Sequence, residues 1–407
     1  LCAPYYLHLF LKAFEGPVKN WFAVTGRISI NDIQGSLYRF SIALMSVAIS
    51  SSLIVALVSS IHSMKNSLHD WINTYMIADI YIKPASCTSN YCFHAMPKEV
   101  AEHIARMEAV ENVGRFRALE LDYRGRKVVA GFGSTEVWAT YGDSDYLDQE
   151  EKSRLAQMES RKEVSISDYL RVKYDLHPGD SLELETPRGL QTFLVRNTAT
   201  SYSTTSGFIY LDHRWLRELW GLDDETQLTV YLRKGQDVDA FVDKLKEDLL
   251  HLYALEIVNN AELRKEIVEI FNRSFSVTYA IEFIAIVVSL IGVINTLLIL
   301  VFERKREISV LRYLGGSWNQ ITGIIILSSG LVGLAGIALG LLMGPFIAIV
   351  IIHVVNKISF GWEVGFAAPY GLLGVLTFVL FLTTLLAGFL PARIARKVDP
   401  KAFVSFE

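Results

Sequence analysis

Long apolar stretches near both ends of the chain are the feature that most limits how it can fold. The first complete stretch, 37–62, carries a charge only at Arg39, and three more follow at 276–302, 321–345 and 370–390. Each is long enough to cross the hydrocarbon core of a bilayer, which takes about 20 residues in a helix. The third remains apolar beyond residue 345, but a Gly-Pro pair there is expected to end the crossing, because proline removes a helix hydrogen bond. Four transmembrane helices are therefore predicted.

Between the first and second apolar stretches lies a polar region of ordinary globular character, residues 63–275. Segments such as ADIYIKP and KVVAGFG alternate like strands, and DVDAFVDKLKEDLLHLY predicts an amphipathic helix with Asp at its start. The flanking spans continue into this region with helical spacing of apolar residues and without proline, so each is expected to form a long stalk. The predicted fold class is an α-helical membrane protein, with an N-terminal apolar stub and a mixed α+β extracytoplasmic domain on helical stalks.

Lys and Arg residues near the ends of the spans set the expected orientation. They gather before the first span, between the second and third, and after the fourth, whereas the loop between the third and fourth contains Lys357 alone. Both ends of the chain are therefore expected to be cytoplasmic, with the large domain extracytoplasmic. The remaining segments are expected to be the end of a preceding apolar segment with a cytoplasmic or interfacial lead-in (1–36), a cytoplasmic coupling helix (303–320), an outer loop (346–369) and a cytoplasmic tail (391–407).

Charge and motif content exclude several classes of function. The formal net charge of −4, with both signs well represented, gives no reason to expect a nucleic-acid partner. The sequence has no Gly-Lys dipeptide and hence no phosphate-binding loop for ATP. It also lacks the G-x-S-x-G and H-E-x-x-H patterns of two hydrolase classes. No catalytic residues, metal or cofactor are therefore predicted for this chain.

Cys87 and Cys92 bracket the segment TSNY in the predicted outer domain. A local disulfide is the favoured interpretation, because disulfides persist in oxidising compartments. The alternative is a metal site formed by Cys87, Cys92 and His94, which lacks a fourth nearby ligand.

The connector ERKREISVLRYLGG, between the second and third spans, is more elaborate than a plain loop. Ile308, Leu311 and Leu314 recur at a three-residue spacing, and Gly315 with Gly316 stops the helix. A short helix of this kind, continuous with a span, could transmit force to a cytoplasmic partner. A basic anchor at the lipid headgroups is the simpler interpretation, but it does not explain the acidic residues or the glycines.

In the third span, glycines four residues apart predict a bare stripe for close helix packing: Gly336, Gly340 and Gly344.

The connector and the glycine-rich span after it resemble the signature of the FtsX-like (MacB-type) ABC transporter permease family. Its pattern is an acidic and basic cluster followed by E-I-x-x-L-R-x-L-G. The matching residues are Glu303, Arg304, Arg306, Glu307, Ile308, Leu311, Arg312, Leu314 and Gly315. The tail LPARIARKVDP and the outer segment VSISDYLRVKYDLHPGDSLELETPRGLQTFLV also resemble the family, as does the order of one span, a large outer domain and three spans.

The resemblance implies a permease subunit in the bacterial plasma (inner) membrane. The connector would be its coupling helix, contacting a cytoplasmic ABC ATPase dimer that holds ATP and Mg. The implied mechanism is mechanotransmission, in which ATPase movements reshape the outer domain to extract or export an amphiphile such as a lipid, lipoprotein or small molecule. The other implied partners are membrane lipid, a periplasmic protein, and the other half of a ten-span permease or a second copy. A signalling complex that activates an envelope enzyme or senses a peptide is the alternative.

Overall fold

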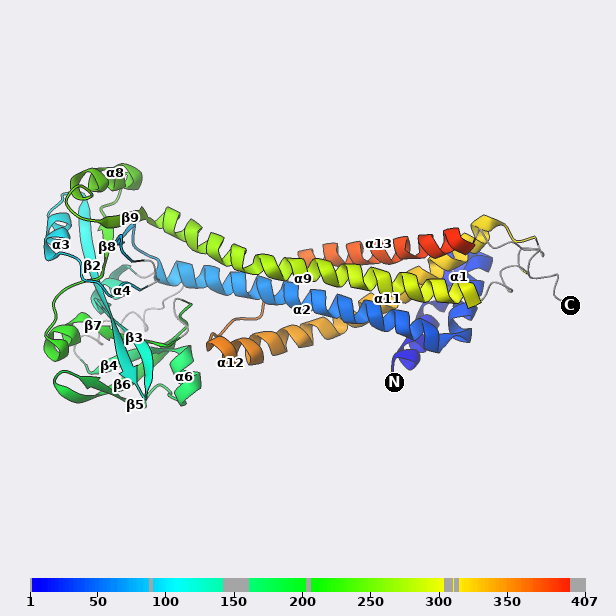
Figure 1. Cartoon of the computed structure of the whole chain (residues 1–407), viewed down its shortest axis with the longest axis horizontal. Coiled ribbons are helices and arrows are strands. Elements are labelled where there is room, and N and C mark those ends of the chain that lie inside the picture. Colours follow the sequence, from blue (N-terminus) through cyan, green and yellow to red (C-terminus); the bar gives the residue numbers. More distant parts are fainter. Residues whose placement is uncertain are drawn as a thin grey trace. The chain divides into compact units, whose positions relative to one another are not determined.

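The computed structural model describes residues 2–87, 91–141, 161–202, 206–303, 310 and 315–395. The chain divides into two compact units (Figure 1). The first, called here the helical unit, comprises Leu1–Ser63, Phe275–Ile351 and Phe366–Glu407. The second, called the outer unit, comprises Met64–Ser274 and Ile352–Gly365. The last of these segments was expected only as part of a loop, yet it belongs to the same compact unit as the large polar domain.

The helical unit consists of α1 (Ala3–Gly35), α11 (Trp318–Val350), α13 (Tyr370–Ala395) and parts of α2 (Leu37–Tyr75) and α9 (Asn260–Glu303). Within the described residues, three helices are long and apolar enough to cross a membrane: Leu37–Tyr75, Trp318–Ser359 and Tyr370–Arg393. Their apolar core also includes Leu7 and Leu11 of α1. The hydroxyl of Tyr6 donates a hydrogen bond to the Ala335 carbonyl oxygen, at 3.1 Å. The N-terminal segment is therefore a packed helix, whose backbone leaves helical geometry only at Ala23.

The helices of the third and fourth predicted spans do not end at 345 and 390, although a proline stands at or just after each of these positions. Helix α11 continues through Pro345 to Val350, and the π-helix η2 (Ile351–Asn356) and α12 (Lys357–Phe360) follow it directly. Helix α13 likewise continues through Pro391. In apolar surroundings a non-helical backbone would leave many polar groups without partners. A single missing hydrogen bond at proline is the smaller cost, so the helix persists.

The two predicted stalks are confirmed as continuous helices. Figure 1 shows α2 and α9 as uninterrupted ribbons. The two helices contain 39 and 44 residues, respectively. Neither contains proline, and the apolar spacing continues past the lipid-like stretch in both. At about 1.5 Å per residue, a helix of 44 residues is roughly 66 Å long, about twice the thickness of the hydrocarbon core.

In the described part of the outer unit, nine strands form one mixed sheet, ordered β5-β6-β4-β7-β3-β2-β8-β1-β9. Most neighbouring pairs are antiparallel, but β3–β7 and β4–β6 are parallel. The strands are β1 (Ile80–Pro84), β2 (Val110–Tyr123), β3 (Arg126–Gly133), β4 (Glu163–Ser167), β5 (Ser181–Thr186), β6 (Gly189–Ala199), β7 (Phe208–Asp212), β8 (Gln227–Leu232) and β9 (Leu255–Asn259). The helices are α3 (Lys98–Ala105), α4 (Thr135–Tyr141), α6 (Asp168–Tyr174), α7 (His213–Trp215), η1 (Leu216–Trp220) and α8 (Val238–Leu249).

Within the described residues, the sheet carries two large apolar cores and a smaller cluster that includes Ala78, Tyr81, Val137 and Tyr231. The stalk-side core joins β1, β8 and β9 to α3 and α8 through Ile80, Val230, Ile257, Ile104 and Leu245. The hairpin-side core packs the strands from β3 through β7 against α6, α7 and η1. It includes Ile166, Phe193, Leu211, Leu170 and Trp215. The long strand β2 contributes Val110 to the first core and Tyr123 to the second. The domain thus has two halves held together by a continuous sheet.

Candidate functional site

The two stalks join the sheet through neighbouring strands. Helix α2 is followed by β1, and β9 leads directly into α9. Strands β1 and β9 pair antiparallel, and Ile80 is the register partner of Asn259. Displacement of one stalk relative to the other would therefore act on one pair of hydrogen-bonded strands at the edge of the sheet.

A polar clamp fixes the stalks to each other at this junction. Arg264 of α9 donates to the side-chain oxygen of Asn73 at 2.6 Å and to the Met76 carbonyl at 2.8 Å. Asn260 donates to the carbonyls of Met76, at 2.9 Å, and Ala78, and its own amide oxygen accepts from Arg264. Carbonyl groups at the end of a helix lack intrahelical partners. Through the clamp, the carbonyl groups of Met76 and Ala78, just beyond the end of α2, accept hydrogen bonds from side chains of α9.

Sequence reasoning missed Arg264 and Asn260, because the segment NAELR reads as an ordinary helix start. Asn259 does have that role, since its side-chain oxygen accepts from the Glu262 backbone N–H at 2.6 Å. The position of Asn260 immediately after a strand and before a long helix is the only signal that could have identified the junction. Its partner Met76 lies far away in the sequence, and only the sheet brings the two together.

The predicted coupling connector lies largely outside the described residues. This applies to Arg304, Arg306, Glu307, Ile308, Leu311, Arg312 and Leu314. Glu303 is the last residue of α9. On the far side, Gly315 has φ +94°, a conformation that favours glycine. Ser317 and Gln320 then form a reciprocal capping box that starts α11.

The glycine stripe of α11 lies against α2 within the helical unit. A Cβ added at Gly336 would come within 2.8 Å of the Val47 Cβ. Added at Gly344, it would come within 2.5 Å of the Val55 Cβ, and Gly340 faces Ser51. These contacts leave no room for side chains, so α2 and α11 pack with their backbones close together.

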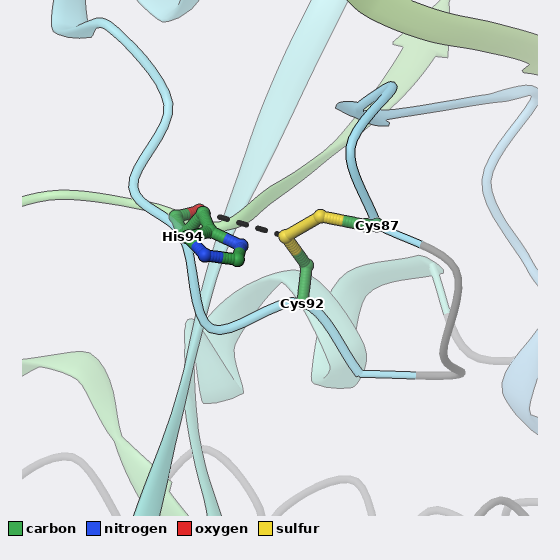
Figure 2. A group of neighbouring side chains, drawn as sticks. All are labelled: Cys87, Cys92 and His94. Carbon is green, nitrogen blue, oxygen red and sulfur yellow. Dashed lines mark hydrogen bonds between the residues drawn. A yellow bond between two sulfur atoms is a disulfide. The ribbon is translucent and has the colours of Figure 1, made fainter.

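The cysteine loop of the outer unit contains a disulfide between Cys87 and Cys92 (Figure 2). Both cysteines are buried, and His94 is exposed beside them. The three ligand atoms lie within 4.8 Å of one another. Metal-binding cysteines act as thiolates, and the disulfide uses both sulfurs. In this state the histidine would be the only ligand left of the three.

Glu225 of the outer unit lies among several charged groups. Met96 donates its N–H to the Glu225 carbonyl at 2.7 Å, and the Glu225 side chain is fully buried. Burial raises the pKa of Glu225, partly offset by the positive charge of Arg115. Neither carboxyl oxygen of Glu225 has a hydrogen-bond partner among the described residues. A buried ionised carboxylate without partners is costly, which favours the protonated form.

Comparison with known proteins connects both units to one family. A family model described as MacB-like periplasmic core domain matches residues 40–248. A second, described as FtsX-like permease C-terminal, matches residues 279–400. The first match covers most of α2 and most of the outer unit, and the second covers the rest of α9 from residue 279, the predicted connector and the last helices.

Three kinds of relative are similar to the chain. An uncharacterized ABC transporter permease of Mycobacterium tuberculosis is 28% identical over 378 residues, which are 90% of this chain and 43% of that protein. The macrolide export ATP-binding/permease protein MacB of Salmonella choleraesuis is 29% identical over 212 residues, 49% of this chain and 29% of that protein. The periplasmic region of MacB from Actinobacillus actinomycetemcomitans aligns with 47% of this chain and 92% of that one, at 12% identity. Its TM-score of 0.32 is too low to support an argument about the fold.

The chain spans less than half the length of these two sequence relatives. One family model nonetheless covers more than half of the chain, and the other adds the C-terminal helices. The periplasmic-domain match contains most of the outer sheet, and the permease match follows it and contains the C-terminal helices. The chain therefore belongs to the FtsX-like, MacB-type family of ABC transporter permeases.

Proposed function

We propose that this chain converts movements of an ATPase into movements of its outer unit, without passing a solute through its own helices. The observation that carries the proposal is the continuity of α2 and α9 with adjacent strands. A permeation pathway would not need helices that continue beyond the bilayer, nor a clamp between them at the sheet. Transmission of force needs both.

The membrane arrangement in this proposal has four crossing helices. The three apolar helices already described are joined by the 276–302 part of α9, which is apolar in sequence. The distribution of Lys and Arg favours a cytoplasmic location for both chain ends and for the connector. The outer unit would then face the outside of the bacterial inner membrane. The four-span segment would act with the other half of a longer permease or with a second copy.

The energy source is proposed to be a cytoplasmic ABC ATPase dimer that carries ATP and Mg. The chain has no phosphate-binding loop of its own. The connector from Glu303 to Gly315 would dock on that dimer through its apolar ridge. Replacing Leu311 by Asp is expected to uncouple ATP hydrolysis from outer-unit movement, whereas Leu311→Met, which keeps an apolar side chain, is expected to preserve coupling.

For the substrate, we propose an amphiphile: a lipid, a lipoprotein or a small molecule. The name of the MacB relative refers to macrolide export, which belongs to the last of these classes. The alternative is a signalling complex in which the outer unit activates an envelope enzyme or senses a peptide. Lipid or a small molecule that copurifies with the complex would favour transport, and a stable periplasmic protein partner would favour signalling.

The transmission proposal is tested by breaking one stalk at an exposed position. Asn272 lies on α9 with its side chain in solvent, and proline there removes a helix hydrogen bond and kinks the helix. A fluorescent probe on Lys244→Cys, in a Cys2→Ser background, reports movement of the outer unit during ATP hydrolysis by the assembled complex. Asn272→Pro is expected to keep ATP hydrolysis and lose the fluorescence change.

The matched control is Asn272→Ala, which replaces the same exposed side chain but preserves the helix. It is expected to behave like the parent protein in both measurements. If Asn272→Pro kept the full fluorescence change, force would not travel through α9. A permeation pathway between the spans would then replace the proposal.

A further inference from the structure

The segment that follows α12 is fastened to the hairpin-side half of the outer sheet. Gly361 ends α12 with φ +71°, and a Cβ there would collide with the backbone of Tyr169 on α6. Both its conformation and this close approach require glycine. The segment therefore lies directly on α6, which follows β4 without a break.

A charged network fixes the same contact. One carboxyl oxygen of Glu363 accepts hydrogen bonds from Arg171 of α6 and from Lys357 of α12, the latter at 2.8 Å. The bond from Lys357 is the main cause of the lowered pKa of Glu363, which is also close to Arg171. Arg171 is also paired with the buried Asp168, at 3.5 Å. Two cations and two acids thus hold the segment at one point on α6.

An aromatic group connects this point to the first stalk. The buried Tyr202 ring stands edge-on to Trp362, with centroids 5.2 Å apart, and to Trp71 of α2, at 5.9 Å. Its hydroxyl donates to the Glu363 carbonyl at 3.3 Å. The Ser67 side chain on α2 also accepts from the Gly365 N–H at 3.1 Å. These contacts, with those of Gly361 and Glu363, are called here the loop latch.

The latch and the stalk junction act on different halves of the sheet. The stalks end in β1 and β9, which belong to the stalk-side core. The latch grips α6, whose Leu170 belongs to the hairpin-side core. The latch segment is joined along the chain to α11 through η2 and α12, and to α13 on its other side.

Resting on the proposed function, we infer that the loop latch is a second transmission point. It would carry displacement of the α11–α13 pair to α6 and the hairpin-side half, while α2 and α9 act on the stalk-side half. The outer sheet is then driven at two separate points, and ATP-dependent movement changes the distance between its halves. Glu363 is a positioning residue in this scheme, because it holds the segment on Arg171 and touches no substrate.

The test measures that distance directly, so no substrate has to be known. Spin labels are placed on Glu183→Cys in β5 and Lys244→Cys in α8, both exposed positions in opposite halves, in a Cys2→Ser background. Pulsed electron resonance of the full complex gives the distance with and without ATP. In the parent protein we expect one distance between the labels without ATP and a different one with ATP. The ATP-dependent change is expected to be mostly lost in Glu363→Arg and in Arg171→Glu, because each variant places like charges at the contact that holds the segment on α6.

The double variant Glu363→Arg/Arg171→Glu restores the attraction between these two positions. Lys357 and Asp168 then each face a like charge, so only part of the change is expected to return. Glu363→Gln keeps the shape of the side chain and is expected to give an intermediate loss. Glu218→Arg is the matched control, because its exposed ion pair with Arg214 involves no residue of the latch. It should leave the distance change intact, and ATP hydrolysis should persist in every variant.

Three results would overturn the inference. The distance change could survive in both single latch variants, it could be absent from the parent protein, or the double variant could restore none of it. Each of them leaves the Lys244 fluorescence test intact, so transmission through α9 would stand without the latch. Conversely, an unchanged fluorescence response in Asn272→Pro would refute the proposed function itself.

Discussion

At the scale of single residues, Glu225 is the least expected feature of the outer unit. It is an acid with no exposed surface, and its pKa is raised chiefly by burial. An acid whose pKa is higher in the folded than in the unfolded state binds more protons when folded. Stability therefore falls as pH rises from the unfolded pKa through the folded one.

Glu225→Gln is expected to stabilise the protein at neutral pH by a few degrees in melting temperature, of the order of 2–4 °C. The gain in melting temperature should disappear below about pH 4.5, the ordinary pKa of a glutamate side chain. Below that pH the Glu225 carboxyl of the parent protein is neutral in both the folded and the unfolded state. Thermal melting of the purified protein across pH measures it. Glu183→Gln, at an exposed position of β5, is the control, and an equal pH-independent shift in both variants would contradict the argument.

The disulfide gives a second prediction at this scale. In non-reduced protein under denaturing conditions, a thiol reagent is expected to label Cys2 alone, because the other two cysteines are joined. Changing both Cys87 and Cys92 to Ser should cost roughly 2–3 kcal/mol at most, since the closed loop is short. The protein should still fold. Three labelled thiols per chain in the absence of reductant would rule the disulfide out.

At the scale of elements, the contact between α2 and α11 depends on glycine. Gly336→Val is expected to destabilise the protein by about 1–3 kcal/mol, because a larger side chain would be forced against Val47. Gly374→Val in α13 is the matched control, since a Cβ there meets nothing within 4 Å. Melting temperatures in detergent compare the two variants. Equal losses would mean that helix propensity, rather than packing, determines the effect.

Elements with a strong local signal were predictable from the sequence, and those set by long-range contacts were not. Asp237 accepts hydrogen bonds from two backbone N–H groups at the start of α8, as its position before an amphipathic stretch indicates. The segment MPKEVAEHIARMEAV has the pattern of one helix up to Val110, but α3 ends at Ala105 and Val110 begins β2. Pairing with Leu232 of β8 determines this outcome, and such pairing is invisible in a local pattern.

In the candidate site too, features with a local sequence signal were predictable and features that depend on long-range contacts were not. The continuity of both stalks followed from the absence of proline and the persistence of helical spacing. The clamp through Arg264 and the latch through Glu363 did not. Each depends on residues far apart in sequence: Arg264 reaches Asn73, and Glu363 reaches Arg171. No periodic pattern marks a single polar residue that finds its partner only after folding.

At the scale of the whole molecule, the orientation in the membrane can be tested chemically. A membrane-impermeant maleimide applied to spheroplasts is expected to label Lys244→Cys in the outer unit. Lys401→Cys in the tail should react only after the membrane is permeabilised. Both variants carry Cys2→Ser, so each has one reactive thiol. Labelling of Lys401→Cys in intact spheroplasts would invert the proposed arrangement.

The pairing of Ile80 with Asn259 has a consequence for modularity. Because the polypeptide enters the sheet and leaves it at partner positions, the segment between them forms an insertion with adjacent ends, as an exchangeable module requires. A chimera could replace residues 79–259 without changing the spacing of the two helices that hold them. The Glu363 contact adds a condition to such an exchange: residues 361–365 have to be transplanted together with the insertion, because their docking surface travels with it.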